Sequence, residues 1–453
     1  MQVWRGLVRD AGCDPEAVSV DAMLLTAAFL TIAARTKDET RVDHRDACKS
    51  RAIDRVIQAV DELLEHRLGY VPPEAVAGSV ASELCDVLDA CTTPPLRPGA
   101  IAFVTARCLD ARLGRTFVDA FRVRSGSRIR GGAPIPVVAF PAEHLNQHER
   151  DAVLAALGAR TGDPRKRADA VDRTDHLRLA PAALDHLRVR SIWADPWLDA
   201  VDAETRFAAG VTNPAPLTTE FRWQTYVVGS RSVFYGVEPR DIDAQRTRLE
   251  AVLAEARQEQ ATILVLPELC LTRGLFDELV QRGAFEGFSL VVAGSFHEPV
   301  PPHAPGANVS AVFANGMQVF THRKFSDFYL GACHEHLVRA DGDAGFDLLV
   351  SPRGTVVVLV CKDAFGEVGD LVQALAPTLL LIPAMSEETV DFEVLARRLA
   401  HDPQGFTLVA CAGPKVSAIF GRPSLESPVI TANPTSIGCE IFTVAGCCEM
   451  KVN

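Results

Sequence analysis

Three residues in the second half of the 453-residue chain have side chains that could act together in covalent catalysis: Glu268, Lys324 and Cys361. A cysteine thiolate is a nucleophile, and its pKa falls beside positive charge or at the start of a helix. A partly buried carboxylate has a raised pKa, as a general base requires. A lysine near a reacting carbonyl stabilises the oxyanion that develops there. Glu268 could therefore generate the Cys361 thiolate, and Lys324 could balance the charge.

Cys361 lies at a predicted strand-to-helix turn. Residues 355–360 (TVVVLV) form a short apolar, mostly β-branched run, which is typical of a buried strand. The pattern GEVGDLVQALAP, from Gly366, predicts a helix after it. Such a turn presents the thiol at the end of the sheet, where helix N–H groups favour the thiolate. A core cysteine is the alternative, and this stretch alone favours it.

Glu268 and Lys324 also follow predicted strands. Glu268 comes directly after the apolar run ILVLP, and Lys324 ends a predicted hairpin over residues 307–324 that turns at Asn315-Gly316. Because all three residues follow strands, a layered sheet can bring them together at one edge. Taken singly, Glu268 could be a helix N-cap and Lys324 a surface charge, so the hypothesis depends on the set.

The surrounding elements indicate two domains. After residues 213–216 (NPAP), strand and helix patterns alternate, which is typical of an α/β layered fold. We therefore expect an α/β domain over residues 222–453 and a mainly α-helical domain of unknown function over residues 1–215. In the latter, Asp14 is a predicted N-cap, and residues 99–124 fit either a strand and a helix or two helices.

Composition limits the compartment and the partners. The net charge of −12 argues against nucleic acid as the main partner. No apolar stretch reaches 18 residues, the length that indicates a transmembrane helix. The N-terminus lacks the zones of a signal peptide. The 12 cysteines form no CxxC pair, so we expect reduced thiols in a cytoplasmic protein without contact to a membrane.

Four segments, in order, resemble the carbon-nitrogen hydrolase (nitrilase) superfamily over about residues 222–445. They are the glutamate segment ILVLPELCLT, the hairpin ANVSAVFANGMQVFTHRKF with Asn308, the nucleophile segment VLVCKDAFGE, and the pair LLLIPAM and ARRLAHDPQGFTLVACAG. The resemblance implies an α-β-β-α sandwich. One such segment would be weak evidence, whereas four in order are strong.

The resemblance also implies the role of each residue. Glu268 would be the general base, Cys361 the nucleophile and Lys324 the oxyanion stabiliser, and the backbone N–H of Lys362 would complete the oxyanion hole. Glu335, eleven residues after Lys324, would be the second glutamate of many members. Cys361 would attack an amide or nitrile carbon and form a thioester, which water would hydrolyse. This chemistry needs no cofactor.

The chain departs from the family pattern in ways that bear on the substrate. Glu268 and Lys324 are 56 residues apart, and Lys324 and Cys361 are 37 apart, so the loops that wall the pocket are short. Short loops could mean an open pocket, a pocket completed by the N-terminal domain, or lost activity. Lys362 replaces a residue that is often aromatic or small and polar. Asp363, an acid two residues after the cysteine, favours an amide over a nitrile.

The hypothesis is therefore a thiol-dependent hydrolase of a non-peptide C–N bond. A weak or silent module in a protein assembly and an acyltransferase that uses the same thioester are the alternatives. The family commonly forms homo-oligomers through the sandwich, and a protein partner of residues 1–215 is conceivable. The segment Cys333-His334-Glu335-His336 could in principle bind a metal, but its ligands are too close together for a standard zinc site. The sequence identifies neither the substrate nor the role of the first domain.

Overall fold

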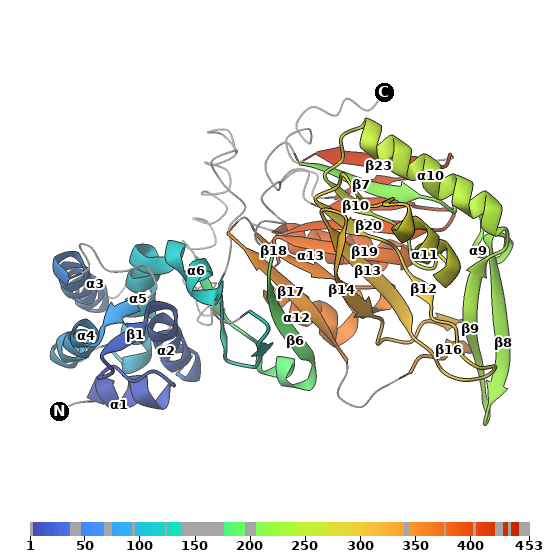
Figure 1. Cartoon of the computed structure of the whole chain (residues 1–453). Coiled ribbons are helices and arrows are strands. Elements are labelled where there is room, and N and C mark those ends of the chain that lie inside the picture. Colours follow the sequence, from blue (N-terminus) through green and yellow to red (C-terminus); the bar gives the residue numbers. More distant parts are fainter. Residues whose placement is uncertain are drawn as a thin grey trace. The chain divides into compact units, whose positions relative to one another are not determined.

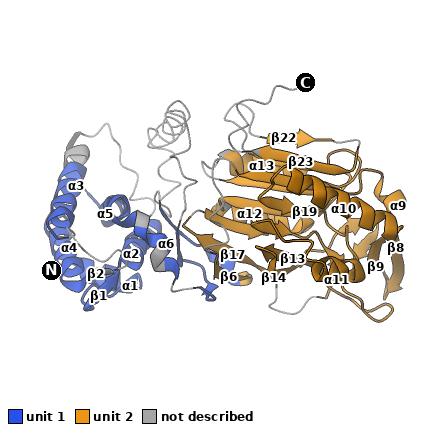
Figure 2. Cartoon of the chain, turned by 45° about the horizontal axis from the view of Figure 1, so that its top comes forward, with its two compact units in different colours: residues 1–139, 145–185 blue, residues 140–144, 186–453 orange. Residues whose placement is uncertain are grey.

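The computed structural model describes most of the chain. The described residues are 3–36, 47–67, 75–92, 96–122, 125–136, 176–194, 205–338, 344–352, 354–375, 377–401, 405–421, 429–433 and 436–443. The chain forms two compact units (Figure 2), residues 1–139 with 145–185, and residues 140–144 with 186–453. They are called unit 1 and unit 2. Among the described residues, no helix combines the length and the apolar character that crossing a bilayer requires.

Unit 1 contains several helices and a few short strands. Its helices are α1 (Val3–Asp10), α2 (Ala22–Arg35), α3 (Ala47–Arg67), α4 (Gly78–Cys91), α5 (Pro98–Leu113) and α6 (Phe117–Arg122). Its strands include the antiparallel pairs β1 (Ser19–Asp21) with β2 (Ala75–Ala77), and β4 (Pro134–Pro136) with β5 (Leu177–Leu179). Residues 99–124, for which two interpretations were open, lie mostly in the two helices α5 and α6.

The apolar helix α2 begins at Ala22, later in the chain than the predicted N-cap Asp14 implies. The Asp21 carboxylate accepts a hydrogen bond from the Leu24 N–H at 2.9 Å and caps the helix. The predicted N-cap, Asp14, is wrong, because its carboxylate accepts from the Glu16 N–H in an exposed turn. The apolar pattern begins before the helix does, and β1 occupies the residues between.

Unit 2 is a mixed α/β structure built on two large sheets. The first has the strand order β12-β13-β11-β10-β7-β23, with β14 paired to β13. Its strands are β7 (Arg206–Val211), β10 (Ile263–Val265), β11 (Leu290–Val292), β12 (Phe296–His297), β13 (Asn308–Ala314), β14 (Met317–Arg323) and β23 (Gly438–Thr443). The predicted hairpin is confirmed as β13 and β14, and both turn residues, Asn315 and Gly316, have positive φ.

The second sheet contains the strand that precedes Cys361. Its order in unit 2 is β22-β21-β20-β19-β18-β17-β6. The strands are β6 (Arg188–Trp193), β17 (Gly345–Ser351), β18 (Gly354–Val358), β19 (Leu379–Met385), β20 (Phe406–Ala412), β21 (Ala418–Gly421) and β22 (Val429–Ala432). The parallel strands β18, β19 and β20 are buried along their whole length, which explains their continuous apolar sequences.

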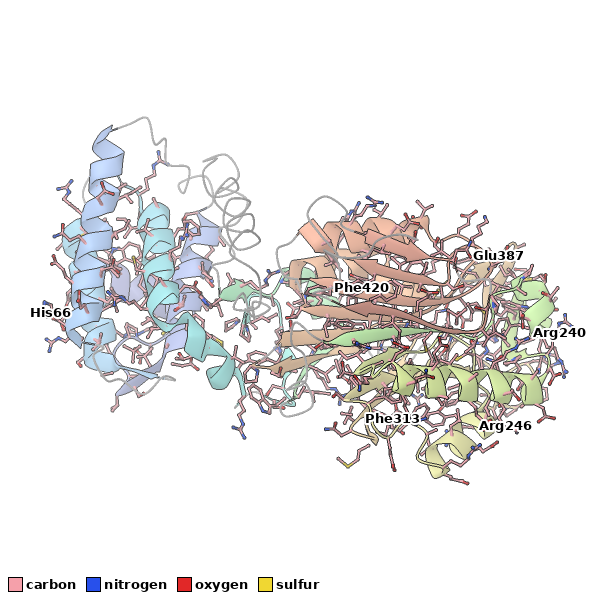
Figure 3. All side chains as sticks on the ribbon, turned by 90° about the horizontal axis from the view of Figure 1, so that it is seen from above. His66, Arg240, Arg246, Phe313, Glu387 and Phe420 are labelled. Carbon is pink, nitrogen blue, oxygen red and sulfur yellow. The ribbon has the colours of Figure 1, made fainter. Side chains whose placement is uncertain are left out.

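The two sheets pack face to face (Figure 1). Phe207 of the first sheet and Phe420 of the second lie in the shared core with ring centroids 5.4 Å apart. Figure 3 labels Phe420. Helices α10 (Ile242–Gln258) and α11 (Arg273–Gln281) cover the other face of the first sheet, where Phe313 lies in their apolar cluster. Helix α13 (Val390–His401) packs on β20 and β21 of the second sheet.

Glu335 lies in a smaller third sheet of unit 2. Its order is β15-β16-β9-β8, from β8 (Phe221–Val228), β9 (Arg231–Pro239), β15 (Tyr329–Leu330) and β16 (Cys333–Glu335). Strands β8 and β9 form an antiparallel hairpin that turns at Gly229, whose φ is 61°. Strand β16 runs parallel to β9, with Glu335 opposite Phe234.

The two units divide between residues 185 and 186, about 30 residues before the domain boundary predicted at residues 213–216. Strands β6 and β7 precede that boundary, yet each pairs within a large sheet of unit 2. The Asn-Pro segment is not a linker, because Asn213 is buried and donates a hydrogen bond to Gln245 Oε1 at 3.1 Å. Its Pro and Asn residues mark a turn inside the unit.

Candidate active site

Glu268, Lys324 and Cys361 meet at one end of the facing sheets. Glu268 follows β10, Lys324 follows β14, and Cys361 begins the short helix η6 (Cys361–Ala364) after β18. The Lys324 ammonium donates a hydrogen bond to Glu268 Oε1 at 2.8 Å. All three side chains are buried, and the charges of Glu268 and Lys324 both act on the Cys361 thiol. The strand ends thus bring together the three residues that the sequence singled out.

Glu335 is the second carboxylate at Lys324. Its Oε2 atom accepts from the Lys324 ammonium at 2.6 Å and from the Phe328 N–H at 3.2 Å. The amide of Asn308 links the two carboxylates, donating to Glu268 Oε1 at 2.9 Å and to Glu335 Oε1 at 3.1 Å. One ammonium is therefore held between two carboxylates whose positions a shared amide fixes.

The imidazole of His297 contacts Glu335, and no sequence pattern indicated His297 as a site residue. The Val237 N–H donates to His297 Nδ1 at 3.0 Å, so the ring proton lies on Nε2, which is 2.9 Å from Glu335 Oε1. The ring also stacks on Tyr235, with centroids 4.2 Å apart. The imidazole therefore donates to the Glu335 carboxylate from Nε2 and helps to hold it in place beside Lys324.

The electrostatics of the cluster follow from burial and from one positive charge. Burial lowers the pKa of Lys324, but Glu268 and Glu335 outweigh it and hold that pKa well above its ordinary value. Burial opposes the ionisation of Glu335, but Lys324 and the His297 hydrogen bond outweigh it and lower the pKa to about 2. Burial raises the pKa of Glu268; Lys324 opposes the rise and Glu335 supports it. The carboxyl with the raised pKa is the one suited to accept a proton.

The resting state of Cys361 differs from the expectation. Burial, and then the Glu268 charge, raise the pKa of the thiol well above its ordinary value, although Lys324 opposes this. The expected thiolate with a lowered pKa is therefore wrong for the resting protein, because burial and the Glu268 charge outweigh the effect of Lys324. The backbone of Cys361 has a φ of 48°, a left-handed conformation that is rare for residues other than Gly. Its Sγ atom lies 3.8 Å from the Met385 carbonyl oxygen.

Asp363 joins the turn of the nucleophile to the segment that carries Lys324. Its buried carboxylate lies 2.8 Å from His322 Nε2 and accepts from the Phe325 N–H at 3.2 Å and the Ser326 N–H at 2.8 Å. These residues flank Lys324 on both sides. Asp363, which the sequence linked only to the choice of substrate, therefore positions Lys324 relative to Cys361.

Lys362 follows the nucleophile in the sequence and, with Lys324 and Tyr329, helps to line a cavity of about 670 Å³. Its backbone N–H is among the first of helix η6, and such N–H groups have no partner within their own helix. It can therefore donate a hydrogen bond, and the family resemblance implies that the acceptor would be an oxyanion. Its ammonium lies 4.0 Å from the centroid of the Tyr329 ring.

The segment Cys333-His334-Glu335-His336 does not gather its side chains around one point. Glu335 faces Lys324, His334 packs against the Tyr329 ring, and His336 Nδ1 lies 2.8 Å from the Tyr226 hydroxyl. In the part of the chain that the structure describes, no three His, Cys, Asp or Glu residues are placed to hold a metal ion.

No family model and no curated protein matches the chain. Among solved structures, an amidase from Nesterenkonia sp. is similar at 15% identity over 55% of this chain and 94% of its own, with a TM-score of 0.39. Saccharomyces cerevisiae Nit3, of the nitrilase superfamily, is similar at 17% over 53% and 89%, with a TM-score of 0.35. A glutamine-dependent NAD+ synthetase from Acinetobacter baumannii is similar at 12% over 52% and 45%, with a TM-score of 0.37. These similarities leave almost half of this chain uncovered.

Proposed function

We propose that this protein is a thiol-dependent hydrolase of the carbon-nitrogen hydrolase type, which cleaves a non-peptide C–N bond with Glu268, Lys324 and Cys361. The observation that carries the proposal is the buried Lys324 ammonium, bonded to Glu268 at 2.8 Å and to Glu335 at 2.6 Å beside the Cys361 thiol. An ammonium between two carboxylates, one of which has a raised pKa, is costly to bury in a protein core beside a thiol, and such perturbed groups cluster at functional sites.

In the proposed mechanism, Glu268 takes the proton from the Cys361 thiol as sulfur attacks the carbonyl carbon of an amide. The oxyanion of the tetrahedral intermediate accepts hydrogen bonds from the Lys324 ammonium and the Lys362 N–H. Glu268 returns the proton to the leaving nitrogen, the C–N bond breaks, and ammonia or an amine departs from a thioester. Glu268 then removes a proton from water, which attacks the thioester and releases the carboxylic acid and the thiol.

We further propose that unit 2 is an α-β-β-α sandwich of the nitrilase type. Two facing sheets with α10 and α11 on one outer side and α13 on the other support this. The substrate would be an amide rather than a nitrile, as the acid at Asp363 implies by resemblance. A cytoplasmic homo-oligomer without a bound cofactor is the form we expect, with the mainly helical first part of the chain in a separate role. Light scattering after size-exclusion chromatography would measure the oligomeric state.

The test of the proposed function is the release of ammonia or amine from a library of small amides and nitriles. Hydrolysis of an amide by the wild type, lost in Cys361→Ala and in Glu268→Gln, is the expected result. Hydrolysis that survives Cys361→Ala would contradict the proposal. Release of nitrogen only when an added amine is present would instead indicate an acyltransferase, and no turnover of any compound would favour a silent module.

A further inference from the structure

The cavity beside Lys324 has a strongly cationic lining. In addition to Lys324 and Lys362, it is lined by three arginines, Arg188, Arg190 and Arg323, and by two carboxylates, Asp327 and Asp347. Cationic side chains around a cavity raise the local concentration of anions and favour anionic ligands. Which charge is left for a ligand depends on the partners that each cation already has.

Several of these cations are engaged by carboxylates. Arg190 forms a two-pronged pair with Asp347, with N–O distances of 2.8 and 2.9 Å. Arg323 lies 3.5 Å from Glu298, and Lys324 is held by Glu268 and Glu335. These pairs reduce the positive charge that the cations present to a ligand.

Lys362 differs from these cations in its partner. Its ammonium lies over the half-exposed ring of Tyr329, and among the described residues no carboxylate lies within 4.0 Å of it. A ring face attracts an ammonium and holds it in place, but it leaves the full positive charge uncompensated. Lys362 therefore offers a positioned charge at the wall of the cavity that no carboxylate of the described residues neutralises.

We propose that Lys362 determines specificity by binding a carboxylate of the substrate, so that the enzyme acts on amides that carry a second, anionic group. This inference rests on the proposed function. The backbone N–H of Lys362 would face the reacting carbonyl, while a flexible four-carbon stem carries its ammonium into the cavity. One residue thus links the two ends of the substrate, with the carboxylate a few atoms from the amide.

A carboxylate suits this site better than a phosphate. Lys362 supplies one positive charge, which a carboxylate matches, whereas a phosphate monoester carries about −1.5 to −2 at neutral pH. The Asp327 carboxylate, which also lines the cavity, would repel the additional charge. Succinamate, in which two methylene groups separate an amide from a carboxylate, is a suitable probe, and butyramide is its neutral analogue of similar size.

The experiment measures the dissociation constants of both probes by calorimetry on the full chain with Cys361→Ala, which prevents turnover. We expect succinamate to bind at least tenfold more tightly than butyramide. Lys362→Met should reduce this ratio to nearly one, and Lys362→Arg should retain most of it, because both variants keep the backbone N–H. Arg240→Met, which removes an exposed cation elsewhere in unit 2 (Figure 3), is the charge-matched control and should leave the ratio unchanged.

Equal affinity for the two probes, no measurable binding of succinamate, or a ratio that survives Lys362→Met would each overturn the proposal. Its failure can be distinguished from failure of the proposed function. Binding of succinamate through Lys362 without hydrolysis of any amide would support the carboxylate site but refute the proposed hydrolase function. Hydrolysis of neutral amides with no preference for anionic ones, and no effect of Lys362→Met on KM, would support the hydrolase and refute the carboxylate site.

Discussion

The Asp363 carboxylate lies 2.8 Å from His322 Nε2, and both side chains are fully buried. Asp363 comes two residues after Cys361, and His322 comes two residues before Lys324. The contact therefore connects the segments that carry the nucleophile and the proposed oxyanion stabiliser. Together with the bonds from the Phe325 and Ser326 N–H groups, it fixes the distance between them.

Asp363→Ala should weaken both folding and catalysis. It leaves the His322 ring and two backbone N–H groups without their buried acceptor, and one such loss costs roughly 1–3 kcal/mol. We expect urea unfolding to show a loss of at least this size, and kcat to fall because Lys324 is no longer held. Asp370→Ala, at an exposed position on helix α12 (Gly366–Leu375), is the matched control. A variant with the stability and kcat of the wild type would contradict the positioning role.

Glu335→Gln should change how stability depends on pH. The folded pKa of Glu335 is about 2, below the unfolded value of roughly 4.3, so its charge stabilises the fold above about pH 4. This contribution, roughly 3 kcal/mol by linkage, is lost as the pH falls toward 2. The wild type should therefore be more stable than Glu335→Gln at pH 5, and the difference should narrow on acidification.

Urea unfolding of both proteins between pH 5 and pH 2 measures that difference. Glu387→Gln, which removes an exposed carboxylate (Figure 3), should keep a small and constant difference from the wild type. A gap between wild type and Glu335→Gln that stays constant over this range would mean that Glu335 is not the low-pKa carboxylate.

Lys324→Met should be the most damaging substitution at the site. It removes the only positive charge between Glu268 and Glu335 among the described side chains that contact both, and leaves two buried carboxylates facing each other. Breaking a buried pair in this way costs roughly 3–5 kcal/mol, and removing an oxyanion donor lowers kcat by about 10²–10³-fold. Thermal unfolding and the hydrolysis assay measure the two effects. Lys415→Met, at an exposed position, should change neither.

The parts of the site that the sequence predicted are those with a local pattern. An apolar run followed by Glu268, a hairpin that ends before Lys324 and a strand-to-helix turn at Cys361 are each readable over about ten residues. Their order along the chain then suggested that they meet. The structure brings these three side chains together and places Glu335 at the Lys324 ammonium.

The parts that the sequence did not predict depend on contacts between distant residues. His297 has no local pattern that separates it from any other histidine, and its partners Val237 and Glu335 are 60 and 38 residues away. The raised pKa of Cys361 arises from burial between the sheets, which a strand-and-turn pattern does not quantify. The boundary between the units was misplaced because β6 and β7 pair with strands that come much later in the sequence.

The measurement that most directly tests the assembled site is the rate at which iodoacetamide alkylates Cys361, followed by intact mass and peptide mapping. Because burial raises the pKa of this thiol, rapid alkylation requires transfer of its proton to Glu268. We predict that Cys361 reacts faster than the other 11 cysteines, at a rate that changes little between pH 6 and 8 because the proton stays within the pair. Glu268→Gln should react more slowly at pH 7, and its rate should rise about tenfold per pH unit. A Cys361 that reacts no faster than the other thiols, or whose rate and pH dependence are unchanged by Glu268→Gln, would contradict the account.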